Sequence, residues 1–166
     1  MKKGLTLIEV LVYIVTLSII VVAVFSFALW AVRSNAKARA MREVIDNARR
    51  AMEILTHEIK EAEDVYLPIT TSSQLSLETT KYLPIGEKTT YIDFYLCGNQ
   101  ICFKKESQNP IALTSERVRV SKLIFERVVT GEVPSLEIDL QIDYAGDRPE
   151  YTASLNLKST VSLRSY

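Results

Sequence analysis

An uncharged apolar stretch near the start of the chain constrains this protein more than any other feature of its sequence. It runs from Val10 to Val32 and is interrupted only by four hydroxyl-bearing residues: Tyr13, Thr16, Ser18 and Ser26. A helix rises about 1.5 Å per residue, so about 20 apolar residues cross a hydrocarbon core of about 30 Å. The sequence therefore predicts that residues 5–32 form a transmembrane helix.

A cleavable signal peptide is the alternative interpretation of this stretch. Lys2 and Lys3 supply a basic start, and Ala36-Lys37-Ala38 imitates a small-residue cleavage site. The apolar core of a signal peptide is usually about 7 to 15 residues long, however. Here the core is longer and the possible cleavage site lies beyond Arg33, so the lengths favour a segment that stays in the membrane.

Composition argues against several classes of function. Among the 166 residues, 20 Lys and Arg balance 20 Asp and Glu, so the chain has no bulk positive charge that would attract nucleic acid. His57 is the single histidine, and the sequence contains neither a phosphate-binding glycine loop nor a nucleophile elbow. We therefore predict that the protein is not an enzyme and uses no metal, cofactor or small-molecule substrate.

Glu9 is the one charged residue between Lys3 and Arg33. A carboxylate within the hydrocarbon costs several kcal/mol, so an ionisable residue there is by default paired or functional. The alternative is that Glu9 lies at the membrane surface and reaches water. The residues around it, Met1-Lys2-Lys3-Gly4-Leu5-Thr6-Leu7-Ile8-Glu9, resemble the processing signal of type IV prepilins. In that signal a short basic leader ends in glycine, and a hydrophobic residue and Thr-Leu-Ile-Glu follow. Leu5 stands where phenylalanine is commonest.

The resemblance implies that a prepilin peptidase cleaves after Gly4, removing a leader of residues 1–4, and that the new amino terminus on Leu5 is methylated. It also implies that Glu9 neutralises the amino terminus of a neighbouring pilin or pseudopilin subunit in a filament, which removes two unpaired charges from lipid. The implied location is the bacterial cytoplasmic membrane, crossed once with the head outside the cytoplasm, and then a cell-surface or periplasmic filament.

The helical pattern continues beyond the membrane, with apolar residues on one face. They recur at spacings of three and four from Met41 to Tyr66, and no Gly or Pro occurs between Leu5 and Leu67. The pattern predicts one helix of roughly 60 residues, with an amphipathic half over residues 33–67. Proline disfavours the α conformation in the residue before it, so Leu67-Pro68 is predicted to end the helix.

The extramembrane half of the helix is polarised. Its early residues are basic (Arg33, Lys37, Arg39 and Arg42), and its late residues are acidic (Glu58, Glu61, Glu63 and Asp64). The basic part of one subunit could therefore face the acidic part of a neighbour in a staggered filament. The basic residues outnumber Lys2 and Lys3, so they oppose the rule that Lys and Arg stay on the cytoplasmic side. The predicted orientation therefore rests on the resemblance.

Residues 68–166 are predicted to form a β-rich head. Apolar and polar residues alternate from Leu136 to Tyr144, and alternate again from Tyr151 to Leu163 after a turn at 145–149, so these segments should form a hairpin. Further strands are predicted at 91–97, 101–105 and 118–128, with turns at 98–100 and 130–132. The apolar face of this antiparallel sheet needs a cover, and the helix stripe from Met41 to Tyr66 can supply it. The predicted fold is α+β.

Cys97 and Cys102 flank the predicted turn Gly98-Asn99-Gln100. If they lie opposite each other in a hairpin they approach disulfide geometry, and oxidation is expected outside the cytoplasm. Two free structural thiols are the alternative. Metal binding is not predicted, because a structural zinc site normally needs four ligands.

The end of the helix and the closing segment 159–164 are similar to minor pilins and J-type minor pseudopilins of type II secretion. This similarity implies a subunit at or near a filament tip. A different class of function stays open, in which the head is a membrane-anchored extracellular binding domain that never polymerises. A third hypothesis, DNA capture through the basic segment 33–50, is disfavoured by the balanced charge.

Overall fold

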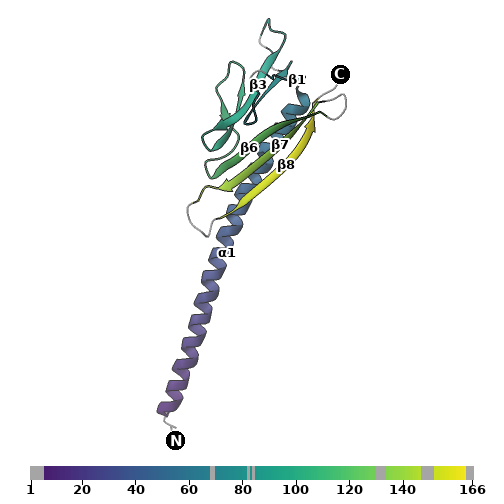
Figure 1. Cartoon of the computed structure of the whole chain (residues 1–166). Coiled ribbons are helices and arrows are strands. Elements are labelled where there is room, and N and C mark those ends of the chain that lie inside the picture. The colour runs from purple at the N-terminus through teal and green to yellow at the C-terminus, as the bar shows by residue number, and fades with distance from the viewer. Residues whose placement is uncertain are drawn as a thin grey trace.

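A long helix and two antiparallel sheets make up the computed structural model, which describes residues 6–67, 70–81, 83, 85–129, 134–146 and 152–163. In Figure 1 the first half of the helix α1 (Leu7–Glu61) stands clear of the head, and its second half lies against β-strands. The predicted α+β layout is therefore confirmed. The processing site Gly4–Leu5, the turn 130–132 and part of the turn 145–149 lie outside the described residues.

The helix α1 begins and ends on defined caps. Thr6 is the N-cap, with an extended backbone and a side-chain oxygen that accepts from the Glu9 backbone N–H. Ala62 is the C-cap, so the prediction that the helix continues to Leu67-Pro68 is wrong. The chain leaves the helix earlier because the segment after it joins a sheet: Glu63 N–H donates to Glu78 O and Tyr66 N–H donates to Ser76 O, each at 2.9 Å.

The first sheet has five strands in chain order, each antiparallel to the next: β1 (Asp64–Val65), β2 (Gln74–Thr79), β3 (Thr90–Cys97), β4 (Gln100–Lys105) and β5 (Ile111–Ala112). The strands β3 and β4 match predicted strands, whereas β1, β2 and β5 were not predicted. In β2 the polar Ser76 is buried between Leu75 and Leu77. Its burial is compensated by a 2.6 Å hydrogen bond from its hydroxyl to Asp93 on β3.

The second sheet has three strands in chain order: β6 (Val118–Val129), β7 (Pro134–Tyr144) and β8 (Ser154–Ser162). The predicted antiparallel hairpin is confirmed as β7 and β8, in a register that pairs Leu140 with Leu157 and Ile142 with Leu155. The sequence predicted one sheet on the helix, but the strands divide into two sheets. The helix packs against the three-stranded sheet, mainly β7 and β8.

One continuous hydrophobic core joins the helix and both sheets. The helix contributes one face, with Ala40, Val44, Ala48, Ala51, Met52, Leu55 and Ile59 buried. The predicted stripe from Met41 to Tyr66 is confirmed in part, because Met41, Ile45 and Tyr66 are only half-buried. Alternate residues of β7 meet it, and Leu136, Ile138, Leu140 and Ile142 are essentially inaccessible. Backbone hydrogen bonds of 2.9 Å from Phe125 to Ser72 and from Val120 to Asn99 tie the sheets together.

Candidate functional site

The apolar first half of α1 is a large exposed hydrophobic surface. Every described apolar side chain from Leu7 to Trp30 is exposed, and the most apolar window of the helix has a mean hydropathy of 2.8 with none of it buried. A soluble monomer rarely exposes a contiguous apolar patch of more than a few hundred Å². By length and composition this helix can cross a membrane.

Glu9 lies in the first turn of this exposed helix, with Thr6 as its N-cap. Its backbone N–H lies 3.4 Å from Thr6 Oγ1 and 3.1 Å from Thr6 O. The sequence Thr6-Leu7-Ile8-Glu9 has the spacing of a capping box, and a carboxylate in the first turn also favours the helix dipole. The sequence interpretation missed this local role, although Thr-x-x-Glu is readable. The bond uses the backbone of Glu9 and leaves its carboxylate exposed.

A polar clamp holds the head to the helix above the apolar half. The Ser115 backbone N–H donates to Asn47 Oδ1 at 2.8 Å, and Asn47 Nδ2 donates to Glu43 O at 2.8 Å. The Glu43 carboxylate lies 3.8 Å from the Arg117 guanidinium. No local sequence pattern predicts this clamp, because 68 residues separate Asn47 from Ser115.

Acidic residues at the end of the helix contact polar residues of the head in the same chain. Glu61 lies 3.8 Å from the Lys81 ammonium, and Thr80 Oγ1 donates to the Glu63 carboxylate at 2.9 Å. These contacts are partly exposed, and such pairs typically contribute less than about 1 kcal/mol.

Four charged side chains cross the three-stranded sheet: Lys122 on β6, Glu137 and Asp139 on β7, and Lys158 on β8. The hydrogen bond from the Lys122 ammonium, together with the charge of Lys158, holds the pKa of Asp139 below its usual value despite burial of the residue. The hydrogen bond with Glu137 and the charge of Asp139 raise the pKa of Lys158. Each charge has an opposite partner, which indicates a structural role.

The structure bonds Cys97 to Cys102, and their Cα atoms are 5.8 Å apart. The geometric argument assumed that the two cysteines lie directly opposite each other. They do not, because Cys97 pairs with Gln100 and Cys102 pairs with Tyr95. They are diagonal neighbours on one face of the β3–β4 hairpin. Gly98 opens the two-residue turn with φ 65°, a conformation that glycine adopts without a steric cost.

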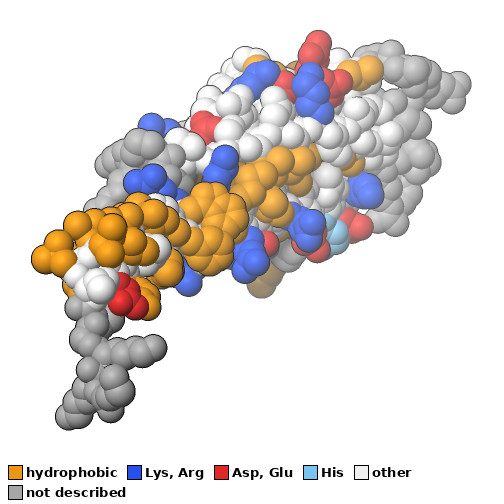
Figure 2. Space-filling view, turned by 90° about the horizontal axis from the view of Figure 1, so that it is seen from below, with side chains coloured by type: hydrophobic (Ala, Val, Ile, Leu, Met, Phe, Trp, Pro, Cys, Tyr) orange, Lys and Arg blue, Asp and Glu red, His pale blue; other side chains and the backbone are white. Residues whose placement is uncertain are grey.

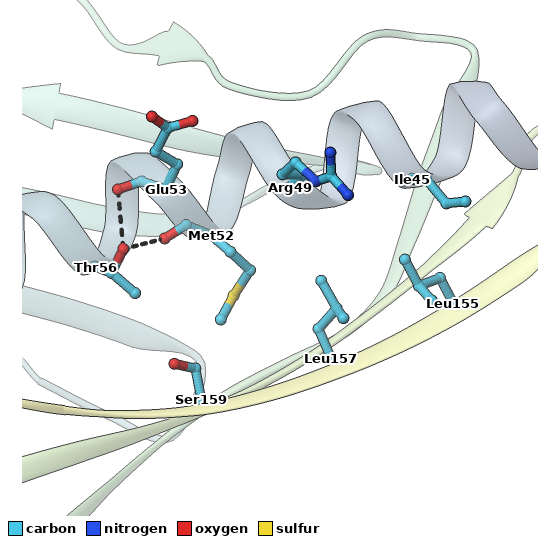
Figure 3. Close-up of a pocket in the computed structure, with 8 residues that line it drawn as sticks. All are labelled: Ile45, Arg49, Met52, Glu53, Thr56, Leu155, Leu157 and Ser159. Carbon is cyan, nitrogen blue, oxygen red and sulfur yellow. Dashed lines mark hydrogen bonds between the residues drawn. The ribbon is translucent and has the colours of Figure 1, made fainter.

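A groove of about 540 Å³ lies between α1 and β8 (Figure 3). Its walls are mainly apolar, with Ile45 and Met52 on the helix and Leu155 and Leu157 on the strand. Arg49 and Glu53 project from the helix at its margin, and Thr56 bonds back to its own helix. The groove can accept an apolar side chain, but it places no general base beside a nucleophile.

In the described part of the chain, no three His, Cys, Asp or Glu side chains converge on a point where a metal ion could bind. The features that remain are the exposed apolar helix, the isolated Glu9 near its start, and the head clamped to its far half. Comparisons of the chain with protein-family models, with curated proteins and with solved structures return no match.

Proposed function

We propose that this protein is a minor pilin or pseudopilin. A prepilin peptidase would remove residues 1–4, and the mature chain would join or initiate a type IV pilus-like filament or a type II secretion pseudopilus. The observation that carries the proposal is the string Gly4-Leu5-Thr6-Leu7-Ile8-Glu9, directly before the uncharged stretch Val10 to Val32 of a helix that continues into a β-rich head.

The physical basis of the proposal is the isolation of Glu9. An exposed carboxylate at the start of a membrane-length helix lacks a described partner for its charge. A neighbouring subunit's amino terminus would pair with it as the subunit enters the filament. Such a pairing relieves the cost of two separate charges in lipid and sets the axial position of each new subunit.

A non-polymerising, membrane-anchored binding domain is the second candidate. The capping arrangement of Thr6 and Glu9 favours this candidate, because capping the start of the helix explains the Thr-x-x-Glu spacing without any contact between subunits. The apolar groove between α1 and β8 would then be a possible contact surface of the head. The two candidates make opposite predictions for the charge of Glu9.

Substitution of Glu9 separates the two candidates. Glu9→Gln removes the charge but keeps a residue that can complete a capping box, whereas Thr6→Ala removes the cap and keeps the charge. In a host with the peptidase and the other subunits, we expect Glu9→Gln to insert into the membrane but to be lost from sheared filaments. Thr6→Ala should still be incorporated. If Glu9→Gln is incorporated as well as wild type, the anchor candidate replaces the filament proposal.

Processing supplies an independent test. Intact mass and N-terminal sequence of the membrane-extracted protein should show loss of Met1 to Gly4 and one methyl group on Leu5, only when a prepilin peptidase is present. A matched Gly4 variant with a bulky residue, such as Gly4→Leu, should keep its full start. An intact start in the wild type, or a cut near Ala38, would refute the prepilin assignment.

A further inference from the structure

A cavity of about 470 Å³ lies where the bare helix meets the head. The helix lines it with Val32, Asn35, Ala36 and Arg39, and the head contributes Arg117 and Tyr144. The clamp described above supports this geometry, because the Ser115 N–H donates to Asn47 Oδ1 and the Arg117 guanidinium lies 3.8 Å from the Glu43 carboxylate. A second backbone bond, from Ala145 N–H to Arg117 O at 2.9 Å, holds the loop of Arg117 against the end of β7.

The position of the cavity along the axis of α1 matches the headgroup layer of a membrane. The apolar stretch ends at Val32, and Asn35 and Arg39 follow it by about 4.5 and about 10.5 Å along the helix axis. The polar layer of each leaflet is about 5 to 8 Å thick. Helical side chains tilt toward the N-terminus of their helix, so Arg39 reaches back toward the lipid.

The charge of the cavity is positive. Two arginines, Arg39 and Arg117, face one carboxylate, Glu43, which is 3.8 Å from Arg117. Arg39 makes no ion pair with any carboxylate in the described part of the chain, and the Arg117 side chain is 74% exposed. Figure 2, a view from the N-terminal end, shows Lys and Arg side chains on several sides of the helix behind its apolar end.

We propose that this cavity binds the phosphate of an anionic phospholipid headgroup in the leaflet where α1 leaves the membrane. Guanidinium groups match phosphate oxygens in geometry and charge. Val32 and Ala36 form an apolar wall that the glycerol and first acyl carbons of a lipid can contact, whereas a free phosphate cannot use it. A lipid also accounts for basic residues on the side of the membrane where Lys and Arg are usually scarce.

The inference rests on the proposed function in two respects: α1 spans a membrane, and the head lies outside the cytoplasm. Bound lipid would connect the head to the membrane surface at a second point besides the helix, and so fix the direction in which the head leans. This orientation would precede any filament contact and would not need one.

Lipid titration of the full-length protein in detergent, followed by native mass spectrometry, tests the proposal. The probes are phosphatidylglycerol and phosphatidylcholine of the same acyl composition. We expect wild type to bind phosphatidylglycerol roughly tenfold more tightly, because both lipids carry the phosphate but the choline cation of phosphatidylcholine opposes the positive charge of the two arginines. Arg39→Gln should abolish the preference, and Arg39→Lys should keep part of it. Arg50→Gln, the same change on an exposed part of the same helix, should leave it unchanged.

Several results would overturn the proposal. They are equal affinity of wild type for the two lipids, an unchanged preference in Arg39→Gln, or an equal loss in Arg50→Gln. Displacement of the lipid by millimolar inorganic phosphate would assign the cavity to a free phosphate instead. Glu9→Gln separates this inference from the filament proposal, because it should impair assembly and leave the lipid preference intact. A preference that depends on Arg39 in a chain that never assembles would support the lipid site alone.

Discussion

Leu55 and Leu17 carry the same side chain on the same helix in opposite surroundings. Leu55 is 0% exposed in the core of the head, and Leu17 is 62% exposed on the bare half of the helix. We expect Leu55→Ala to lower the free energy of unfolding of the head by about 2 to 5 kcal/mol, because a cavity replaces packed atoms. Leu17→Ala should change it by less than about 0.5 kcal/mol. Denaturant unfolding of the full chain in detergent measures both, and equal losses would contradict the assigned core.

The shifted pKa values of Asp139 and Lys158 predict how the stability of the head depends on pH. The pKa of Asp139 is lowered from 3.8, so its contribution is present above about pH 3.8 and is lost as pH falls through the lowered pKa. The pKa of Lys158 is raised from 10.5, so its contribution is present below about pH 10.5 and is lost as pH rises through the raised pKa. We therefore expect the melting temperature to fall at both extremes.

Melting curves of Asp139→Asn and of a matched control test this expectation. Asp139→Asn should flatten the acid side of the profile, because it removes the carboxylate with the lowered pKa. Asp46→Asn, at an exposed helix position, should keep the wild-type profile. An acid limb that is equally steep in wild type and in Asp139→Asn would show that other carboxylates control it.

At the scale of elements, the disulfide between β3 and β4 predicts a measurable effect of reduction. Cys97 and Cys102 are five residues apart. Chain entropy gives such a short loop a stabilisation of about 2 kcal/mol at most, and less if strain opposes it. We expect a reductant to lower the melting temperature of wild type but not of a Cys97→Ser, Cys102→Ser double variant. Two titratable thiols in the purified, unreduced protein would instead support the free-thiol alternative.

Local patterns account for the elements that the sequence predicted correctly. The alternation in β7 buries Leu136, Ile138, Leu140 and Ile142 and identifies a strand with one face in the core. The end of α1 was placed too late because its residues stay apolar at helical spacing to Tyr66. Non-local hydrogen bonds to β2 ended the helix at Glu61, and no local pattern reports a partner strand that follows later in the chain.

At the scale of the whole molecule, the division into two sheets could not be predicted. The strand pattern indicates which side of a strand is buried but does not indicate where one sheet ends and another begins. The candidate sites differ in the same respect: some of their residues are adjacent in the sequence, and others come together only in the fold. Gly4, Leu5 and Glu9 were chosen from adjacent residues, whereas the cavity at the head joins Arg39 to Arg117 and Tyr144, which only the folded chain brings together.

The polarity of α1 predicts a contact between subunits if the filament proposal holds. Reversal of one charge, Arg42→Glu or Glu61→Arg, should reduce incorporation into sheared filaments, and the double reversal should restore part of it. Glu61 would give up its partly exposed ion pair with Lys81 at small cost in free energy. If neither single reversal nor the double reversal changes incorporation, this contact does not exist in the filament.

Because the clamp holds the head to the second half of α1, the head moves with the helix when the helix tilts. The buried part of the helix begins at Ala40, and the whole helix of 55 residues is about 80 Å long. If the apolar half of α1 spans a membrane, a tilt of about 10°, well within the range of transmembrane helices, would move the far end sideways by about 14 Å. Small adjustments in bilayer thickness would thus be amplified into large displacements of the surface that the head presents.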